Sequence, residues 1–109
     1  PEDRVGVCID LGHAHIIESV PGALRAAGGR LIHVHASDNR GEKDEHLVPG
    51  KGTLPWERAI AALKEAGFEG AFTVELRDYT RGDDPSYRDF GQMLAETRAA
   101  LDRILGDGK

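Results

Sequence analysis

The sequence has little of what several common protein classes depend on. Its only cysteine is Cys8, so no internal disulfide can form, and we expect Cys8 to be a buried small hydrophobic residue, not a nucleophile. No stretch approaches the roughly 18 consecutive apolar residues of a membrane-spanning helix. No secretory signal precedes the first apolar segment, and the chain starts at Pro1 instead of methionine. We therefore predict a cytoplasmic protein with no membrane partner and a truncated N-terminus.

Basic residues are also in deficit. Fourteen lysines and arginines against nineteen acidic residues give a formal net charge of -5. A field of this sign repels phosphate backbones, which argues against a nucleic-acid partner. The 39% hydrophobic and 30% charged content is that of a globular domain, but 109 residues are too few for a complete (β/α)₈ barrel of about 200 to 250 residues.

Three short apolar segments predict β-strands, at residues 5–10, 31–35 and 71–76. Each ends in a polar residue of a type that binds metals: Asp10, His35 and Glu75, in that order. In the second segment, the period of two places Leu31, His33 and His35 on one face. Leu11 and Gly12 are expected to stop the first strand.

Helical patterns follow each predicted strand. Ser19 and Pro21 favour a helix that ends at Gly28, and a second helix is predicted over residues 55–66. After a polar loop at 77–84, a third helix is predicted from Pro85 and Ser86 to residue 105. Its apolar stripe consists of Phe90, Met93, Leu94, Thr97, Leu101, Ile104 and Leu105. The fold class is therefore α/β, with a parallel βαβαβα order.

The three strand-end residues suggest a metal site. The carboxyl ends of parallel strands meet at one edge of the sheet, so Asp10, His35 and Glu75 are expected to converge there. Aspartate, histidine and glutamate together supply an anionic nitrogen and oxygen site for a divalent ion. The alternative is that they are polar residues lining a barrel interior.

A second set of candidates lies in the turns. His13 follows Asp10 in a D-x-x-H pattern, and Asp44 with His46 forms D-x-H in the long loop at 36–53. These three residues are candidate ligands of a second metal, for which zinc is the natural ion, or candidate substrate contacts. The alternative is that they are solvated loop residues without such a role. His33 is interpreted as a packed residue or one that supports a ligand. The glycine-rich run at 49–53 is interpreted as a flexible turn in which Lys51 contacts an anionic substrate.

Four motifs occur in order along the chain: D-L-G-H-A at 10–14, H-V-H-A-S-D-N at 33–39, D-E-H-L-V-P-G-K-G at 44–52 and V-E-L at 74–76. Together they resemble the C-terminal part of the sugar phosphate isomerases and epimerases of the xylose-isomerase-like TIM barrel superfamily. Endonuclease IV, of the second AP-endonuclease family, shares that barrel. The resemblance implies that residues 1–109 are the last three units of a (β/α)₈ barrel, that is, a partial barrel.

The resemblance also implies roles for individual residues. Asp10, His35 and Glu75 match the ligands of a divalent metal, which would be Mn²⁺, Mg²⁺, Co²⁺ or Zn²⁺, and the fourth ligand lies on an earlier strand that this chain lacks. Glu75 is in addition the candidate acid/base, and Arg40 lies near the position of a sugar-binding arginine. The implied activity is isomerisation or epimerisation of a sugar or sugar phosphate, by proton transfer next to a carbonyl through a metal-stabilised enediolate.

Two alternatives stay open. In endonuclease IV, the ligands of a third zinc match His13, Asp44 and His46, so a zinc-dependent phosphodiester hydrolase is one alternative. The other is an inactive metal-binding fragment, because three βα units leave strand edges unpaired. Such a fragment is expected to need the missing chain or self-association as a homo-oligomer.

Overall fold

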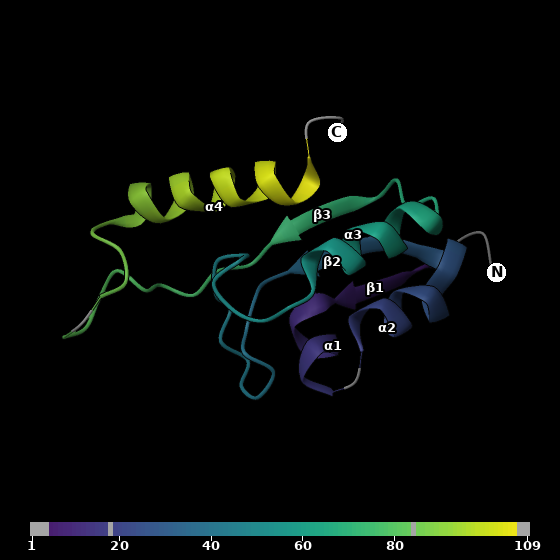
Figure 1. The fold of residues 1–109 in the computed structure, drawn as a ribbon, viewed down its shortest axis with the longest axis horizontal. Helices are drawn as coiled ribbons and strands as arrows, with labels where there is room; N and C mark the ends of the chain where they lie inside the picture. The colour runs from purple at the N-terminus through teal and green to yellow at the C-terminus, as the bar shows by residue number, and fades with distance from the viewer. Residues whose placement is uncertain (1–4, 18, 84, 107–109) are drawn as a thin grey trace.

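The three predicted strands form a single parallel sheet. The computed structural model describes residues 5–17, 19–83 and 85–106. Strands β1 (Val7–Asp10), β2 (Leu31–Ala36) and β3 (Ala71–Val74) pair side by side in that order (Figure 1). The α/β class and the parallel arrangement predicted from the helical crossovers are confirmed.

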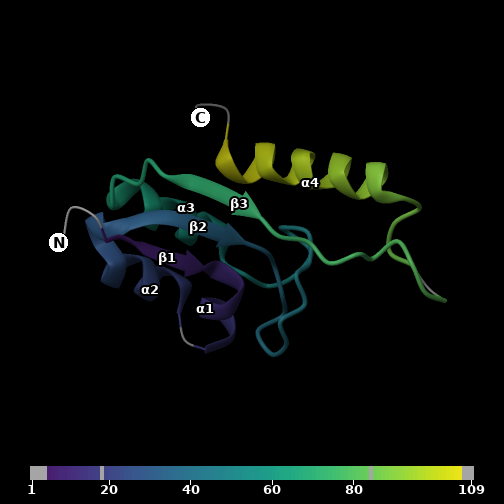
Figure 2. The same ribbon diagram turned by 180° about the vertical axis from the view of Figure 1, so that it is seen from behind.

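The helices leave one face of the sheet bare. Helices α2 (Val20–Ala27) and α3 (Trp56–Glu65) cover one face, where Leu24, Val34 and Leu63 are part of the main core. In the view from behind, no helix lies over the strands (Figure 2). This bare face is the one that would line the interior of a closed barrel.

A short helix follows β1 where the sequence predicted none. Strand β1 ends directly before Leu11, so the predicted stop at Leu11 and Gly12 is confirmed, but these residues also begin helix α1 (Leu11–Ile17), which the sequence did not predict. The reason is a cap: Oδ1 of Asp10 accepts a hydrogen bond of 2.9 Å from the backbone N–H of His13. Aspartate accepting such a bond is a favoured way to begin a helix.

The next two helices agree with their predicted signals. Oγ of Ser19 accepts a hydrogen bond of 3.2 Å from the N–H of Gly22, and α2 ends before Gly28, whose φ is 55°. A one-turn 3₁₀ helix, Gly28–Arg30, then leads into β2. Helix α3 lies within the predicted 55–66.

The last helix, α4 (Phe90–Leu105), begins later than predicted. Its start is set by Asp89, whose Oδ1 accepts a hydrogen bond of 2.9 Å from the N–H of Gln92. The predicted start at Pro85 and Ser86 was wrong because the segment before Asp89 folds back, with the N–H groups of Ser86 and Tyr87 donating to the carbonyl of Tyr79. Residue 84 of the predicted loop 77–84 lies outside the described residues.

The apolar stripe of α4 is only partly buried. Met93 and Thr97 are buried, but Phe90 is 56% exposed and Leu94 51% exposed. The helix packs through Met93 into a small core with Val48 and Tyr87, and its last residues, Ile104 and Leu105, pack against the main core (Figure 1). The predicted stripe is therefore present on α4, but Phe90 and Leu94 do not belong to the core.

Two residues of the sheet also differ from expectation. Cys8 is exposed, because its neighbours Val7 and Ile9 pack against the main core and the alternation of the strand turns Cys8 to the opposite face. The prediction of a buried Cys8 was wrong. The pairing of β1 with β2 shifts between Val7 and Cys8, and Leu31 packs in the main core with Val34 instead of lying beside His33.

Candidate metal centre

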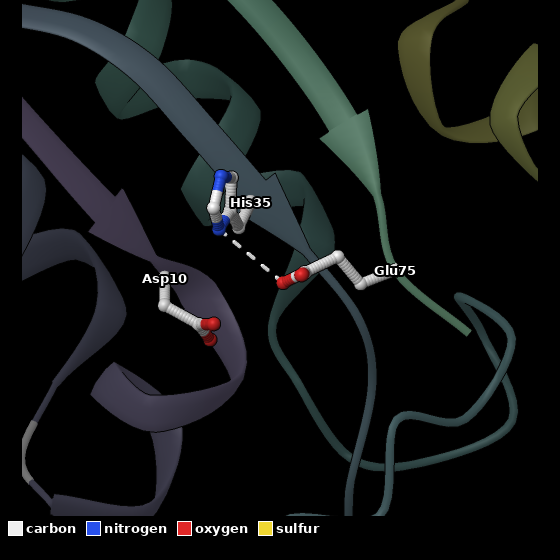
Figure 3. A group of neighbouring side chains, drawn as sticks. All are labelled: Asp10, His35 and Glu75. Carbon is white, nitrogen blue, oxygen red and sulfur yellow. Dashed lines mark ion pairs between the residues drawn. The ribbon is translucent and has the colours of Figure 1, made fainter. Parts of the chain in front are cut away.

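Asp10, His35 and Glu75 converge at the carboxyl end of the sheet, as the strand pattern predicted. One potential metal-binding atom from each residue lies within 4.8 Å of the others. Nδ1 of His35 is 3.3 Å from Oε1 of Glu75. Figure 3 shows the three side chains pointing toward one another from neighbouring strand ends. We call these residues the strand-end group.

The register of the sheet explains the convergence. Asp10 pairs with His35 and His35 pairs with Thr73, so these three residues form one row across the sheet. Glu75 follows Thr73 by two residues and returns to the same face. Its N–H donates to the carbonyl of Ala36 at 2.9 Å, which continues the pairing beyond the end of β3.

His33 supports this group from one row below. Its Nε2 is 3.2 Å from Oγ1 of Thr73, and its ring lies edge-on to the ring of His35, with 4.9 Å between centroids. These contacts restrict how the His35 ring turns. They agree with the interpretation of His33 as a packed or supporting residue.

His13, Asp44 and His46 also meet, although 31 residues separate the first two in sequence. Nε2 of His13 is 3.1 Å from Oδ2 of Asp44, and Nε2 of His46 is 3.2 Å from Oδ1 of the same carboxylate. Nδ1 of His13 lies 3.8 Å from Oδ2 of Asp10, which links the two groups. We call His13, Asp44 and His46 the loop group.

Contacts within the loop group shift the pKa values of His13 and Asp44 in opposite directions. The hydrogen bond with Asp44 and the negative charge of Asp10 raise the pKa of His13. Burial alone would raise the pKa of Asp44, but the hydrogen bond with His13 and the charge of His46 outweigh it and lower that pKa. Without a metal, the histidines therefore serve as partners of the acidic residues.

The donor chemistry of both groups fits a divalent cation. The strand-end group offers two carboxylates and an imidazole, a set that binds Mn²⁺, Mg²⁺, Co²⁺ or Zn²⁺ according to geometry. In the loop group, Oδ1 of Asp44 is a buried oxygen whose ion-pair partner is Nε2 of His46, at 3.2 Å. Two imidazoles and a carboxylate are donors that zinc binds.

Arg40 and Lys51 are paired with acidic residues that belong to neither group. The guanidinium of Arg40 is paired with the carboxylate of Glu45, and Nζ of Lys51 is 3.9 Å from Oε1 of Glu96. Both residues line a cavity of about 450 Å³ together with Tyr79 and Tyr87. Their substrate contacts stay predictions, since each cation already has an acidic partner.

The expected turn around Lys51 is present. Its N–H donates to the carbonyl of Val48 at 3.0 Å, and Gly50 adopts a φ of 94°, which glycine tolerates without steric cost.

Sequence reasoning assigned no role to Asp38 and Asn39, although both lie in the motif at 33–39. Both side chains are fully buried. Asp38 accepts four hydrogen bonds, two from the long loop and two from Leu54 and Trp56 directly after it, and Nδ2 of Asn39 donates to the carbonyl of Gly12 at 2.9 Å. The available signal was their position directly after a buried strand, where a polar pair needs partners.

Among the described residues, no helix combines the length and the apolar character that crossing a bilayer requires.

The chain belongs to the xylose isomerase-like TIM barrel family, whose model matches residues 1–103. The partial barrel expected from the motifs agrees with this membership. The chain spans only 24 to 36% of the length of the first three curated relatives it matches. The three parallel strands and their helices therefore correspond to part of a TIM barrel.

Several relatives are sugar epimerases. The chain is 38% identical to a D-psicose 3-epimerase of Enterocloster bolteae over 105 residues, covering 92% of the chain and 33% of that enzyme. It is similar to the structure of a D-psicose 3-epimerase from Clostridium cellulolyticum H10 with D-tagatose, at 30% identity and a TM-score of 0.75, covering 96% of this chain and 39% of the other. It is also similar to the structure of the IOLI protein with a bound zinc atom, at 27% identity and a TM-score of 0.70. The match covers 94% of this chain and 38% of the IOLI chain.

Proposed function

We propose that this chain is the C-terminal part of a metal-dependent sugar isomerase or epimerase. The observation that carries the proposal is the convergence of Asp10, His35 and Glu75 within 4.8 Å at the carboxyl edge of the sheet. In barrels of this type, catalytic side chains gather at that edge. The proposed substrate is a small sugar or sugar phosphate, since D-psicose 3-epimerases are among the relatives. The cytoplasm stays the predicted location.

Asp10, His35 and Glu75 would hold the divalent ion. When bound, such an ion stabilises the negative charge that develops on neighbouring substrate oxygens during proton transfer. Asp10 is fixed by the bond from the N–H of His13, and His35 is restrained by His33, so these two side chains provide a preorganised site. The fourth ligand implied by the resemblance would come from another part of the barrel.

Glu75 is proposed to move the proton. Its side chain is 43% exposed and points toward His35 and Asp10, where a substrate would approach (Figure 3). A carboxylate within hydrogen-bond reach of the carbon-bound proton next to a carbonyl is a suitable general base. Epimerisation needs a second carboxylate on the opposite side of the substrate, which lies outside this chain, so we expect the 109-residue chain alone to be inactive.

The loop group supports a second candidate, a zinc-dependent phosphodiester hydrolase. His13 and His46 approach opposite oxygens of Asp44, an arrangement that suits a further zinc ion. Clustered metals activate water and stabilise the leaving oxygen in such enzymes. The net charge of -5 weighs against a DNA substrate, and for this reason the isomerase is preferred.

Metal content distinguishes the two candidates. The intact protein encoded by the gene, with its Glu75→Gln and His46→Ala variants, would be studied by elemental analysis and calorimetry. One metal, lost in Glu75→Gln and retained in His46→Ala, is the expected result. Two or three zinc ions, one of them lost in His46→Ala, would support the hydrolase, and the absence of any metal would refute both.

A further inference from the structure

Asp38 carries a buried carboxylate that no part of the proposed function uses. Its side chain is 0% exposed, and four donors surround it. Oδ1 accepts from the N–H of Asn39 at 2.8 Å and of Leu54 at 3.0 Å. Oδ2 accepts from the N–H of Gly50 and from Nε1 of Trp56, both at 2.8 Å.

This arrangement satisfies an ion that would otherwise be expensive to bury. An ionised carboxylate has about four acceptor sites, and all four bonds to Asp38 come from neutral N–H groups. Burial of a carboxylate without such bonds is strongly unfavourable. Any loop conformation that breaks these bonds is therefore disfavoured, so the carboxylate selects one conformation of the loop.

The four donors belong to both ends of the long loop and to the helix after it. Asn39 lies at its start, Gly50 and Leu54 lie at its end, and Trp56 is the first residue of α3. Asp38 and Leu47 also exchange two backbone hydrogen bonds, of 2.9 and 2.8 Å. The segment between them, which contains Asp44 and His46, is thus closed at its base by Asp38.

Asn39 extends the same network to the first strand. Its Nδ2 donates to the carbonyl of Gly12, in the turn of helix that follows Asp10. Its Oδ1 accepts from the N–H of Gly41 at 2.8 Å. The base of the loop is therefore attached to the segment that carries Asp10 and His13.

We propose that Asp38 is a positioning residue for metal binding, which holds the loop group against the strand-end group. The inference rests on the proposed metal site and goes beyond it, because Asp38 lies outside both groups and acts through the loop. The contact between Nε2 of His13 and Oδ2 of Asp44 joins the loop to the helix after β1, as does the bond from Asn39 to Gly12. We expect a loop released from Asp38 to hold Asp44 less firmly against His13.

Asp38→Asn tests the proposal in the intact protein. The amide has the same shape, but whichever way it is placed it turns an NH₂ group toward two donors. Cobalt binding would be followed by calorimetry and by the visible spectrum of Co²⁺, which reports site geometry. We expect an affinity loss of about 10- to 100-fold, typical of residues that support ligands, and an altered spectrum. Without metal, the amides of Gly50 and Leu54 should exchange faster with deuterium.

Two further variants separate positioning from general destabilisation. Leu24→Ala empties part of the core under α2, away from the loop, and should lower stability while leaving the cobalt spectrum unchanged. Trp56→Phe removes one of the four donors and should change the spectrum in the same direction as Asp38→Asn, with a smaller affinity loss. Trp56 is the only tryptophan, so its fluorescence reports on the same contact in the other variants.

The outcomes are distinct. Wild-type affinity and spectrum in Asp38→Asn would overturn the positioning role alone. A similar spectral change in Leu24→Ala would also overturn it, because the effect would then follow stability. If Asp38→Asn does not fold, an unchanged spectrum in Trp56→Phe would be decisive against the proposal. No cobalt binding by the wild type would overturn the proposed function and this inference together.

Discussion

The strand-end group and the loop group are assembled by different means. Asp10, His35 and Glu75 sit on or directly after strands, and backbone pairing alone brings them to one edge. Asp44 and His46 belong to a loop without regular structure, whose shape depends on the buried side chains of Asp38 and Asn39. The comparison indicates that strand register suffices to bring the strand-end group together, whereas the loop group depends on a buried polar network.

The sharpest test of this difference removes a ligand from the strand-end group. Asp10→Asn keeps the cap of α1, because asparagine caps helices about as well as aspartate, but it removes an anionic ligand. We expect calorimetry to show a loss of metal affinity greater than the roughly 10- to 100-fold cost of losing a supporting residue. Asp78→Asn, which removes a carboxylate bonded to Thr80 and Arg81, is the matched control. Equal affinities in the two variants would contradict the assignment.

A side chain added at Gly52 tests the packing of the loop network around Asp38 and Asn39. A Cβ at Gly52 would lie 2.3 Å from the carbonyl oxygen of Asn39 and 2.5 Å from Oδ1 of Asp38. Since backbone must move, we expect Gly52→Ala to reduce the free energy of unfolding by about 1 to 3 kcal/mol in urea titrations. Gly29→Ala is the control, because a Cβ there meets no atom within 4 Å. A similar reduction in both variants would mean that the loop has no special packing.

The same difference explains how much the sequence could reveal. The alternation of apolar residues predicted all three strands, and their polar ends predicted that Asp10, His35 and Glu75 converge. The contacts of Asp38 with Gly50 and Leu54 could not be predicted, because they join residues 12 and 16 positions apart through backbone groups that carry no sequence signal.

Helix starts that depend on one side chain were missed for a related reason. Asp10 was interpreted only as a ligand, although it also caps α1. In α4, the proline at 85 is a common first-turn residue, but Asp89 provides the cap, and the helix starts there. The exposure of Cys8, Phe90 and Leu94 was not predicted because burial depends on neighbours that periodicity alone does not identify.

A smaller effect should come from the backbone of the loop group. His46 has a φ of 54°, and it is the only described residue other than glycine with a positive φ. His46→Gly removes that strain together with the imidazole that pairs with Asp44, so we expect its metal-free stability to exceed that of His46→Ala by about 1 kcal/mol. His46→Ala lacks the imidazole equally but keeps the Cβ, and the difference between the two variants in urea unfolding isolates the backbone contribution. Equal stabilities would show that the loop relaxes without strain.

The smallest effect concerns a carboxylate that bonds to backbone N–H as Asp38 does, but at the surface. Asp89 caps α4, and its hydrogen bond from Gln92 lowers the pKa of Asp89. Because the pKa is lower in the folded state, the stabilisation is complete above the unfolded value of about 3.9 and is lost as pH falls through the folded value.

Asp89→Ala should therefore lower the Tm at pH 7 and have little effect well below the folded pKa. Asp89→Asn keeps a neutral acceptor, so its Tm should vary less between these conditions than that of the wild type. If Asp89→Ala changes the Tm equally at both pH values, the charge of the carboxylate contributes nothing to the cap. Hydrogen bonds from N–H groups to a charged carboxylate would then stabilise the fold only where the carboxylate is buried, as at Asp38.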